Sequence, residues 1–110
     1  MIRNTTILAS AFFILFSGNP IAKELTDCSV TSFSGLFDSN ETNNSMRTEA
    51  LRCHKKTKDY FFAVMACTLG ASTASEKSKF SSYRKTTLKM CEIASDSGHE
   101  LSTEFYEILK

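Results

Sequence analysis

The chain has only one proline, four glycines and two histidines among its 110 residues. It contains no Asn-Gly or Asp-Gly turn and no sustained alternation of apolar and polar residues, the patterns that predict hairpins and strands. The glycines and the proline fall mostly outside the apolar periodic stretches, so little interrupts helix formation. These absences favour an all-α fold, which we predict to be a small disulfide-stapled helical bundle of three to four helices.

Motifs for metal binding and catalysis are also lacking. Neither His54 nor His99 has a second histidine or a paired Cys-x-x-Cys at metal-ligand spacing. No Gly-rich phosphate loop is present, and the Cys-x-x-Cys redox motif is absent. We therefore expect a non-enzymatic protein that uses no metal and no cofactor.

One apolar run near the N-terminus has the features of an export signal. Ile7–Phe16 is apolar, follows a single positive charge at Arg3, and is followed by a small residue, Ala22, suited to cleavage. The segment is too short to span a bilayer as a helix, which requires about 20 apolar residues. We therefore predict a signal peptide over residues 1–22, cleaved near Ala22. The mature domain, residues 23–110, is then periplasmic or secreted, without stable membrane insertion.

Four cysteines, Cys28, Cys53, Cys67 and Cys91, lie in the predicted mature domain. Disulfides persist in exported proteins, and an even number of cysteines in a short chain predicts a disulfide framework. A domain of this size buries a marginal core, which two bridges at about 2–4 kcal/mol each would support. We therefore predict that all four form disulfides.

Apolar periodicity predicts one short helix and three longer ones. The short helix is rich in Ser and Thr, which are poor helix formers, and a polar loop follows it. We expect Ser45 to cap the next helix and Gly70 to end it. The expected helices are residues 29–37, residues 46–70, a third from the capping box Thr73–Glu76 to about Ser95, and residues 99–109, with the polar loop at Asp38–Ser45.

Each longer helix has an apolar face that we expect to form the core. In the last helix, three glutamates, Glu100, Glu104 and Glu107, are expected to face solvent. The predicted core positions are Met46, Ala50, Cys53, Thr57, Tyr60, Val64 and Cys67 in the first long helix, Phe80, Tyr83, Thr87, Met90, Cys91 and Ala94 in the second, and Leu101, Phe105, Ile108 and Leu109 in the last.

The predicted helix over residues 46–70 decides the disulfide pairing. Cys53 and Cys67 would lie about 21 Å apart along it, beyond the roughly 7 Å between Cα atoms that a disulfide allows. A hairpin turning near residue 72 would place Cys53 level with Cys91. We therefore favour Cys53–Cys91 with Cys28–Cys67. The rival, Cys28–Cys53 with Cys67–Cys91, requires the hairpin to slide by many residues.

Charge is unevenly distributed along the chain. Arg47–Lys89 contains ten Lys and Arg residues against three acids, whereas Met90–Lys110 contains five acids against one Lys. Solvated helix faces also carry such charge, but a basic surface favours an acidic protein partner or an anionic envelope surface. Export disfavours nucleic acid as a partner. The predicted partner-binding residues are Arg52, Lys55, Lys56, Lys58, Arg84 and Lys85, and the loop Asp38–Ser45 is the competing site.

Two segments carry a family resemblance. Leu88–Leu101 contains a cysteine in a helix, a short polar break and Glu-Leu opening a last helix, and Ala50–Cys53 supplies an earlier cysteine helix. In these segments the chain resembles the small periplasmic immunity proteins of the type VI secretion amidase family, although Cys28 and Cys67 are additional. The resemblance implies a helical, often dimeric inhibitor that blocks a cell-wall hydrolase by inserting a loop or helix into its cleft.

Export, the cysteines and the resemblance together lead to two functional expectations. The first is a periplasmic immunity protein that neutralises a secreted toxin or cell-wall hydrolase. The alternative is a secreted, disulfide-stabilised effector or toxin-like ligand that acts on another cell. A toxin gene beside the gene for this chain would favour the first expectation.

Overall fold

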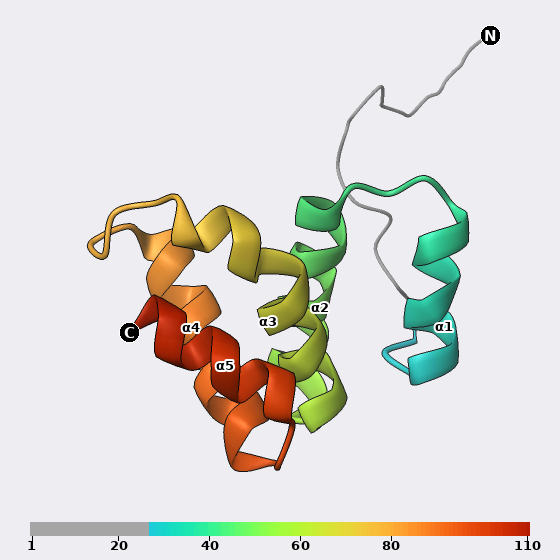
Figure 1. Ribbon diagram of the computed structural model, residues 1–110. Helices are drawn as coiled ribbons and strands as arrows, with labels where there is room; N and C mark the ends of the chain where they lie inside the picture. The colour runs from blue at the N-terminus through green and yellow to red at the C-terminus, as the bar shows by residue number, and fades with distance from the viewer. Residues whose placement is uncertain (1–26) are drawn as a thin grey trace, which may run out of the picture.

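A computed structural model describes residues 27–110, which form five α-helices, one 3-10 helix and no strand (Figure 1). The prediction of an all-α fold with two disulfides is confirmed, with one more helix than expected. The predicted signal peptide, residues 1–22, lies outside the described residues. The elements are α1 (Val30–Ser34), the 3-10 helix η1 (Gly35–Asp38), α2 (Asn43–Thr57), α3 (Tyr60–Ser75), α4 (Ser82–Asp96) and α5 (Glu100–Leu109).

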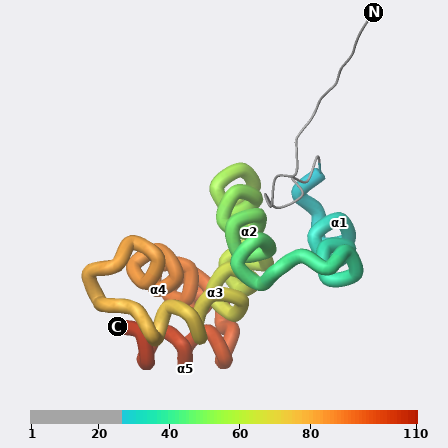
Figure 2. The backbone as a smooth tube through the Cα atoms, turned by 90° about the horizontal axis from the view of Figure 1, so that it is seen from above, coloured from blue at the N-terminus to red at the C-terminus, as the bar shows by residue number. Residues whose placement is uncertain are grey.

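Helix α3 is the centre of the structure. It packs against α2, α4 and α5, and α4 also packs against α5. Figures 1 and 2 show α1 on one side of α2, with α4 and α5 on the other. Phe33 of α1 is fully buried, with its ring centroid 5.8 Å from those of Phe61 and Phe62 in α3. An aromatic cluster therefore attaches the N-terminal segment to the bundle.

The single helix predicted over residues 46–70 is wrong, because the chain breaks between Thr57 and Tyr60. Lys58 adopts a left-handed conformation with φ of 61°, and its N–H donates to the His54 carbonyl at 2.7 Å. Asp59 then caps α3 by accepting from the Phe61 N–H at 2.9 Å. The break lets α2 and α3 pack against each other instead of forming one rod.

Both ends of the predicted helix also lie elsewhere. Helix α2 begins earlier than expected, capped by Thr42 and not by Ser45. Helix α3 continues past Gly70 to Ser75, so Glu76 closes α3 and does not open a third helix. Ser81 caps α4, and residues 76–81 form the α3–α4 loop. At the end of α3, Ala71 and Ala74 are buried against the bundle, whereas Ser72, Thr73 and Ser75 are exposed.

The disulfide pairing favoured from the sequence is wrong, and the rival pairing is present. Cys28 is bonded to Cys53, with Cα atoms 5.4 Å apart, and Cys67 to Cys91, with Cα atoms 4.8 Å apart. Two errors in the predicted helix explain this result. The break after α2 removes Cys53 from the hairpin, and the hairpin turns in the α3–α4 loop, near Lys79, instead of near residue 72.

The predicted core is confirmed in α4 and is partly wrong elsewhere. Thr87, Met90, Cys91 and Ala94 are buried as expected, as is Leu109 in α5. Apolar side chains at element ends and along one side of α5 remain exposed. Side chains predicted to be buried but exposed are Thr57, Tyr60 (54 % exposed), Phe80 (86 %), Leu101 (45 %) and Ile108 (60 %).

One buried cation fixes the crossing of α2 over α3 and α4. Arg47 is buried, and its Nε donates to Thr87 Oγ1 at 3.0 Å while Nη2 donates to the Tyr83 carbonyl at 3.2 Å. Its guanidinium carbon lies 3.7 Å from the centroid of the Tyr83 ring, a cation–π contact. Burial lowers the pKa of Arg47, and the interaction with Tyr83 opposes that shift. The start of α2 is therefore level with the start of α4.

Candidate functional site

Three of the predicted partner-binding lysines lie together at the C-terminal end of α2. Lys55, Lys56 and Lys58 are all exposed, and within residues 27–110 none of them forms an ion pair with a carboxylate. Cations at this end of a helix interact favourably with its dipole, by about 0.3–1 kcal/mol each. We call these three residues the α2-end lysines; their charges are available to a partner.

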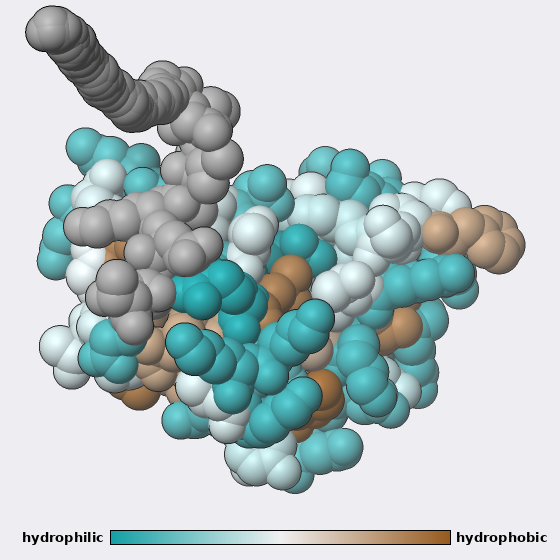
Figure 3. Space-filling view, turned by 180° about the vertical axis from the view of Figure 1, so that it is seen from behind, coloured by the Kyte–Doolittle hydropathy of each residue, from teal (hydrophilic) through white to brown (hydrophobic). Residues whose placement is uncertain are grey.

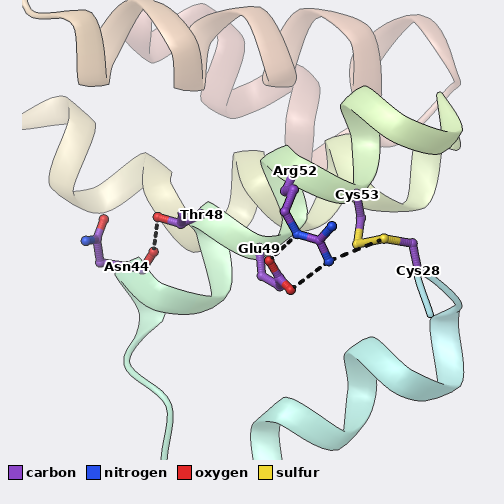
Figure 4. Close-up of polar contacts among 6 residues, drawn as sticks. All are labelled: Cys28, Asn44, Thr48, Glu49, Arg52 and Cys53. Atoms are coloured by element: carbon purple, nitrogen blue, oxygen red, sulfur yellow. Dashed lines mark hydrogen bonds and ion pairs between the residues drawn. A yellow bond between two sulfur atoms is a disulfide. The ribbon is translucent and has the colours of Figure 1, made fainter. Parts of the chain in front are cut away.

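Arg52, the predicted partner-binding residue one helical turn before Lys56, is already paired within the chain. Its Nε donates to Glu49 Oε1 at 2.7 Å and its Nη2 to Glu49 Oε2 at 3.1 Å (Figure 4). Nη2 also lies 3.9 Å from Cys28 Sγ, beside the first disulfide. Because Glu49 is only 3 % exposed, the two-point contact neutralises a buried carboxylate. Arg52 therefore has a structural role.

Arg84 also has a structural role, at the other end of the bundle. Its Nε donates to the Leu109 carbonyl at 3.2 Å, and its Nη1 donates to the carbonyls of Ser75 and Lys77 at 3.3 and 2.9 Å. These carbonyls belong to helix ends and the adjoining loop, where no intrahelical N–H reaches them. Arg84 thus joins the α3–α4 loop to the end of α5.

The predicted basic site is therefore divided between two places. Lys85 is exposed near the start of α4, which lies level with Arg47 at the start of α2. Lys56 lies nine residues after Arg47 in α2, which is about 14 Å along the helix axis at 1.5 Å per residue. The structure does not bring Lys85 together with the α2-end lysines.

His54 is a buried titratable group next to the α2-end lysines in the sequence. It is 9 % exposed, and burial lowers its pKa from the ordinary histidine value, with Lys58 acting in the same direction and Asp59 opposing. A lowered pKa keeps the imidazole neutral beside the lysines. The other histidine, His99, caps α5 by accepting from the Ser102 N–H through Nδ1 at 3.2 Å. The His99 side chain thus caps a helix, whereas the His54 imidazole is buried near the end of α2.

The described residues contain neither a metal-binding cluster nor a membrane-spanning helix. No group of three or more His, Cys, Asp or Glu side chains in residues 27–110 is arranged to hold a metal ion. None of the helices in that part of the chain has both the length and the apolar character needed to cross a bilayer.

The competing loop, Asp38–Ser45, is shorter than predicted. Asp38 belongs to η1 and Asn43 already begins α2, so only residues 39–42 link the two elements. Asn40 has a positive φ of 61°, a conformation that asparagine tolerates better than most residues. A tight connection of this kind presents little flexible chain to a cleft.

Sequence reasoning missed the α3–α4 loop, which carries the most exposed large apolar side chain of the described residues. Phe80 is 86 % exposed. The loop is ordered, since the Phe80 N–H donates to Ser78 Oγ at 3.1 Å and the Ser81 N–H to the Ser78 carbonyl at 2.9 Å. Figure 3 shows apolar surface projecting at the end of the molecule where this loop lies. The serines on both sides of Phe80 were the signal for a turn.

Sequence reasoning also missed a groove between α3 and α5. Its volume is about 160 Å³, and its lining is almost entirely apolar. Leu101, Phe105 and Ile108 occupy one side of α5, and only Phe105 of the three is half-buried. The groove residues are Thr68, Ala71, Ser72 and Ser75 of α3 and Phe105, Ile108 and Leu109 of α5.

Comparisons with known proteins assign no family to this chain. No protein-family model matches it, and no curated protein or solved structure is significantly similar to it.

Proposed function

We propose that the chain is an exported, non-enzymatic binding protein, most concretely a periplasmic immunity protein that neutralises a secreted toxin or cell-wall hydrolase. The observation that carries the proposal is the group of α2-end lysines, exposed and free of ion pairs within residues 27–110. The two disulfides are compatible with export. A rigid cationic end of this kind suits recognition of an acidic protein.

We assign the contact to Lys55, Lys56 and Lys58 and leave out the two arginines. Arg52 and Arg84 already have hydrogen-bonding partners within the chain, so using them would break contacts of the folded protein. The C-terminal half of α2 is anchored by the disulfide at Cys53. Lysines on an anchored helix lose less freedom on binding than lysines on a loose segment, which favours affinity.

Electrostatic complementarity has a recognisable kinetic signature. Exposed charges that meet an acidic surface mainly accelerate association, and added salt suppresses this effect because the Debye length falls to about 8 Å at physiological ionic strength. We therefore expect the association rate with the partner to fall as salt is raised, and to fall further when the α2-end lysines are reversed in charge.

The test is affinity capture from a periplasmic extract of the source organism, with partner identification by mass spectrometry. The double variant Lys55→Glu/Lys56→Glu is compared with Lys79→Glu/Lys85→Glu, which makes the same change in net charge at two exposed lysines in the α3–α4 loop and the first turn of α4. We expect wild type and the control to retain one partner that the first variant loses. Purified wild-type protein should then inhibit the partner's toxic or hydrolytic activity.

Three results would contradict the proposal. Equal retention by both variants, with matching melting temperatures, would mean that the α2-end lysines are not the contact. A partner whose activity is unaffected by binding would not be a neutralised toxin. A receptor recovered only from the surface of another cell would favour the secreted effector instead.

A further inference from the structure

The α3–α4 loop presents Phe80 as a fixed projection. The hydroxyl of Ser78 accepts a hydrogen bond from the Phe80 N–H at 3.1 Å. Arg84 binds the carbonyls of Ser75 and Lys77 at the start of the same loop. The Phe80 ring is 86 % exposed although the backbone beneath it is held in place. A side chain on such an ordered turn loses little conformational entropy when it is buried by a partner.

The neighbours of Phe80 in the sequence are polar and mostly small or cationic. Three exposed lysines lie within five residues of it, and in the described part of the chain none of them forms an ion pair with a carboxylate. We call Lys77, Lys79 and Lys85 the Phe80 lysines. The serines among them are Ser78, Ser81 and Ser82. Figure 3 shows the apolar projection at this end of the molecule with hydrophilic surface beside it.

The net charge around the projection is positive. Arg84 binds carbonyls and not carboxylates, so its charge adds to those of the Phe80 lysines. Glu76 is the only acid among the loop residues 76–81, which leaves four cations against one acid, a balance of +3. At the adjoining end of α5, Lys110 pairs with Glu107 at 2.9 Å, and these two charges offset each other. Counting Glu104, one turn earlier in α5, still leaves a balance of +2.

An apolar ring surrounded by lysines suits a lipid surface better than a protein pocket. A side chain that fills a protein pocket is usually ringed by packed contacts that exclude water, whereas the neighbours of Phe80 are serines and flexible lysines. An anionic bilayer offers an apolar layer to the ring directly beneath a plane of phosphates. Lysine stems can lie along apolar surface while their ammonium groups stay at the level of the phosphates.

We propose that the α3–α4 loop binds reversibly to the surface of an anionic lipid bilayer, with the Phe80 ring inserted below the headgroups and the Phe80 lysines beside the lipid phosphates. One ring and a few cations give weak binding, since even a single myristoyl chain holds a protein only marginally. The contact uses none of the α2-end lysines. It does not depend on the identity of the toxin or hydrolase.

The first test is cosedimentation of the disulfide-intact protein with sucrose-loaded vesicles, over micromolar to millimolar lipid. Vesicles of phosphatidylcholine and phosphatidylglycerol in equal parts are compared with vesicles of phosphatidylcholine alone. We expect wild type to bind only the anionic vesicles and to be released as salt is raised. Phe80→Ala should lower the partition coefficient by about tenfold. Tyr60→Ala is the matched control and should leave it unchanged, since Tyr60 is an exposed aromatic residue at the other end of α3.

The two double variants of the capture experiment separate lipid binding from partner binding. Lys79→Glu/Lys85→Glu should lower the partition coefficient by more than about tenfold, because each lysine near an anionic surface contributes about fivefold. Lys55→Glu/Lys56→Glu makes the same change in net charge and should have a much smaller effect. The expected pattern is the reverse of that for partner capture, so the failure of one proposal is distinguishable from the failure of the other.

Insertion of the ring is measured directly, because the chain contains no tryptophan. The emission of Phe80→Trp should shift to the blue on addition of anionic vesicles and be quenched by lipids brominated in their acyl chains, and Tyr60→Trp should show neither change. Absence of binding to anionic vesicles, equal losses in the two double variants, or an unshifted Phe80→Trp emission would each overturn the proposal. Loss of the captured partner in Phe80→Ala would also overturn it, by assigning the ring to a protein pocket.

Discussion

At the scale of single residues, the crossing of α2 over α3 depends on a position that has no side chain, Gly70. A Cβ placed on Gly70 would lie 2.7 Å from both Cδ and Nε of Arg47, and 3.0 Å from Thr87 Oγ1. Arg47 cannot retreat easily, because Thr87 and the Tyr83 carbonyl hold its guanidinium. Gly70 therefore permits the crossing of α2 over α3.

We predict that Gly70→Ala destabilises the protein although alanine is the better helix former. Overpacking costs about 1–3 kcal/mol, which exceeds or cancels the gain in helix propensity of about 1 kcal/mol. The control is Gly35→Ala, where nothing lies within 4 Å of a new Cβ and φ is −63°. This change should be neutral or stabilise by about 0.4–1 kcal/mol. Urea unfolding of both variants measures the difference, and a more stable Gly70→Ala protein would contradict the packing argument.

At the scale of elements, the break between α2 and α3 shapes the molecule more than any other local feature. Lys58 supplies a left-handed residue that closes α2, and Asp59 begins α3 by capping it. A left-handed conformation is unfavourable for a residue with a side chain, by roughly 1–2 kcal/mol. The surrounding packing maintains this conformation because α2 and α3 bury their apolar faces only when the chain turns here.

We predict that Lys58→Gly stabilises the protein by up to about 1 kcal/mol, since glycine adopts positive φ without strain. Lys56→Gly is the control: it removes the same charge within α2 and should destabilise by about 0.5–1 kcal/mol. Thermal unfolding followed by circular dichroism should show melting temperatures that move in opposite directions. If both variants melt below wild type by equal amounts, the break is not a strained position.

At the scale of the whole molecule, the two disulfides stabilise different regions. Their sequence separations are 25 and 24, so the chain-entropy effect of each is nearly the same, about 3–4 kcal/mol. Cys67–Cys91 joins α3 to α4 inside the core, where both residues are fully buried. Cys28–Cys53 joins the segment before α1 to α2, at the edge of the bundle.

We predict that removing each disulfide has a different spatial effect. Cys28→Ala/Cys53→Ala should increase amide hydrogen exchange mainly in residues 27–42, while α3, α4 and α5 stay protected. Cys67→Ala/Cys91→Ala should lower protection throughout the bundle and cost about 2–5 kcal/mol in unfolding free energy. Non-reducing peptide mapping of wild type should recover Cys28 with Cys53. Recovery of Cys53 with Cys91 would contradict the fold itself.

Local pattern alone was sufficient for part of the structure. The last helix and the buried face of α4, including Thr87 and Met90, follow from apolar spacing, because periodicity reports which side of a helix leaves water. The outward positions of Glu100, Glu104 and Glu107 follow for the same reason. The pairing of Arg52 with Glu49, three residues apart, also lies within reach of a helical pattern.

The sequence contains a signal for the α2–α3 break, but the apolar periodicity across it favours one continuous helix. An N-cap residue directly before an apolar run is a signal for a new helix. Asp59 stands in this position, before Tyr60, Phe61 and Phe62. Apolar residues continue at helical spacing on both sides of Lys58, so the pattern predicts one helix. Because the break was missed, the predicted positions of the cysteines along the paired helices were wrong. The disulfide pairing derived from those positions was therefore wrong as well.

The sequence by itself determined the helical class, the count of cysteines and the uneven distribution of charge, because these depend on residue types and their spacing. Only the tertiary structure decided which charges are free and which apolar residues are exposed. The Arg84 guanidinium is already hydrogen-bonded, because carbonyls from the ends of α3 and α5 meet beside it. One of them, the carbonyl of Leu109, is 25 residues away in the sequence. Phe80 is exposed because the α3–α4 turn extends beyond its neighbours. The contacts of Arg84 join segments that are far apart in the sequence, and no local pattern encodes them.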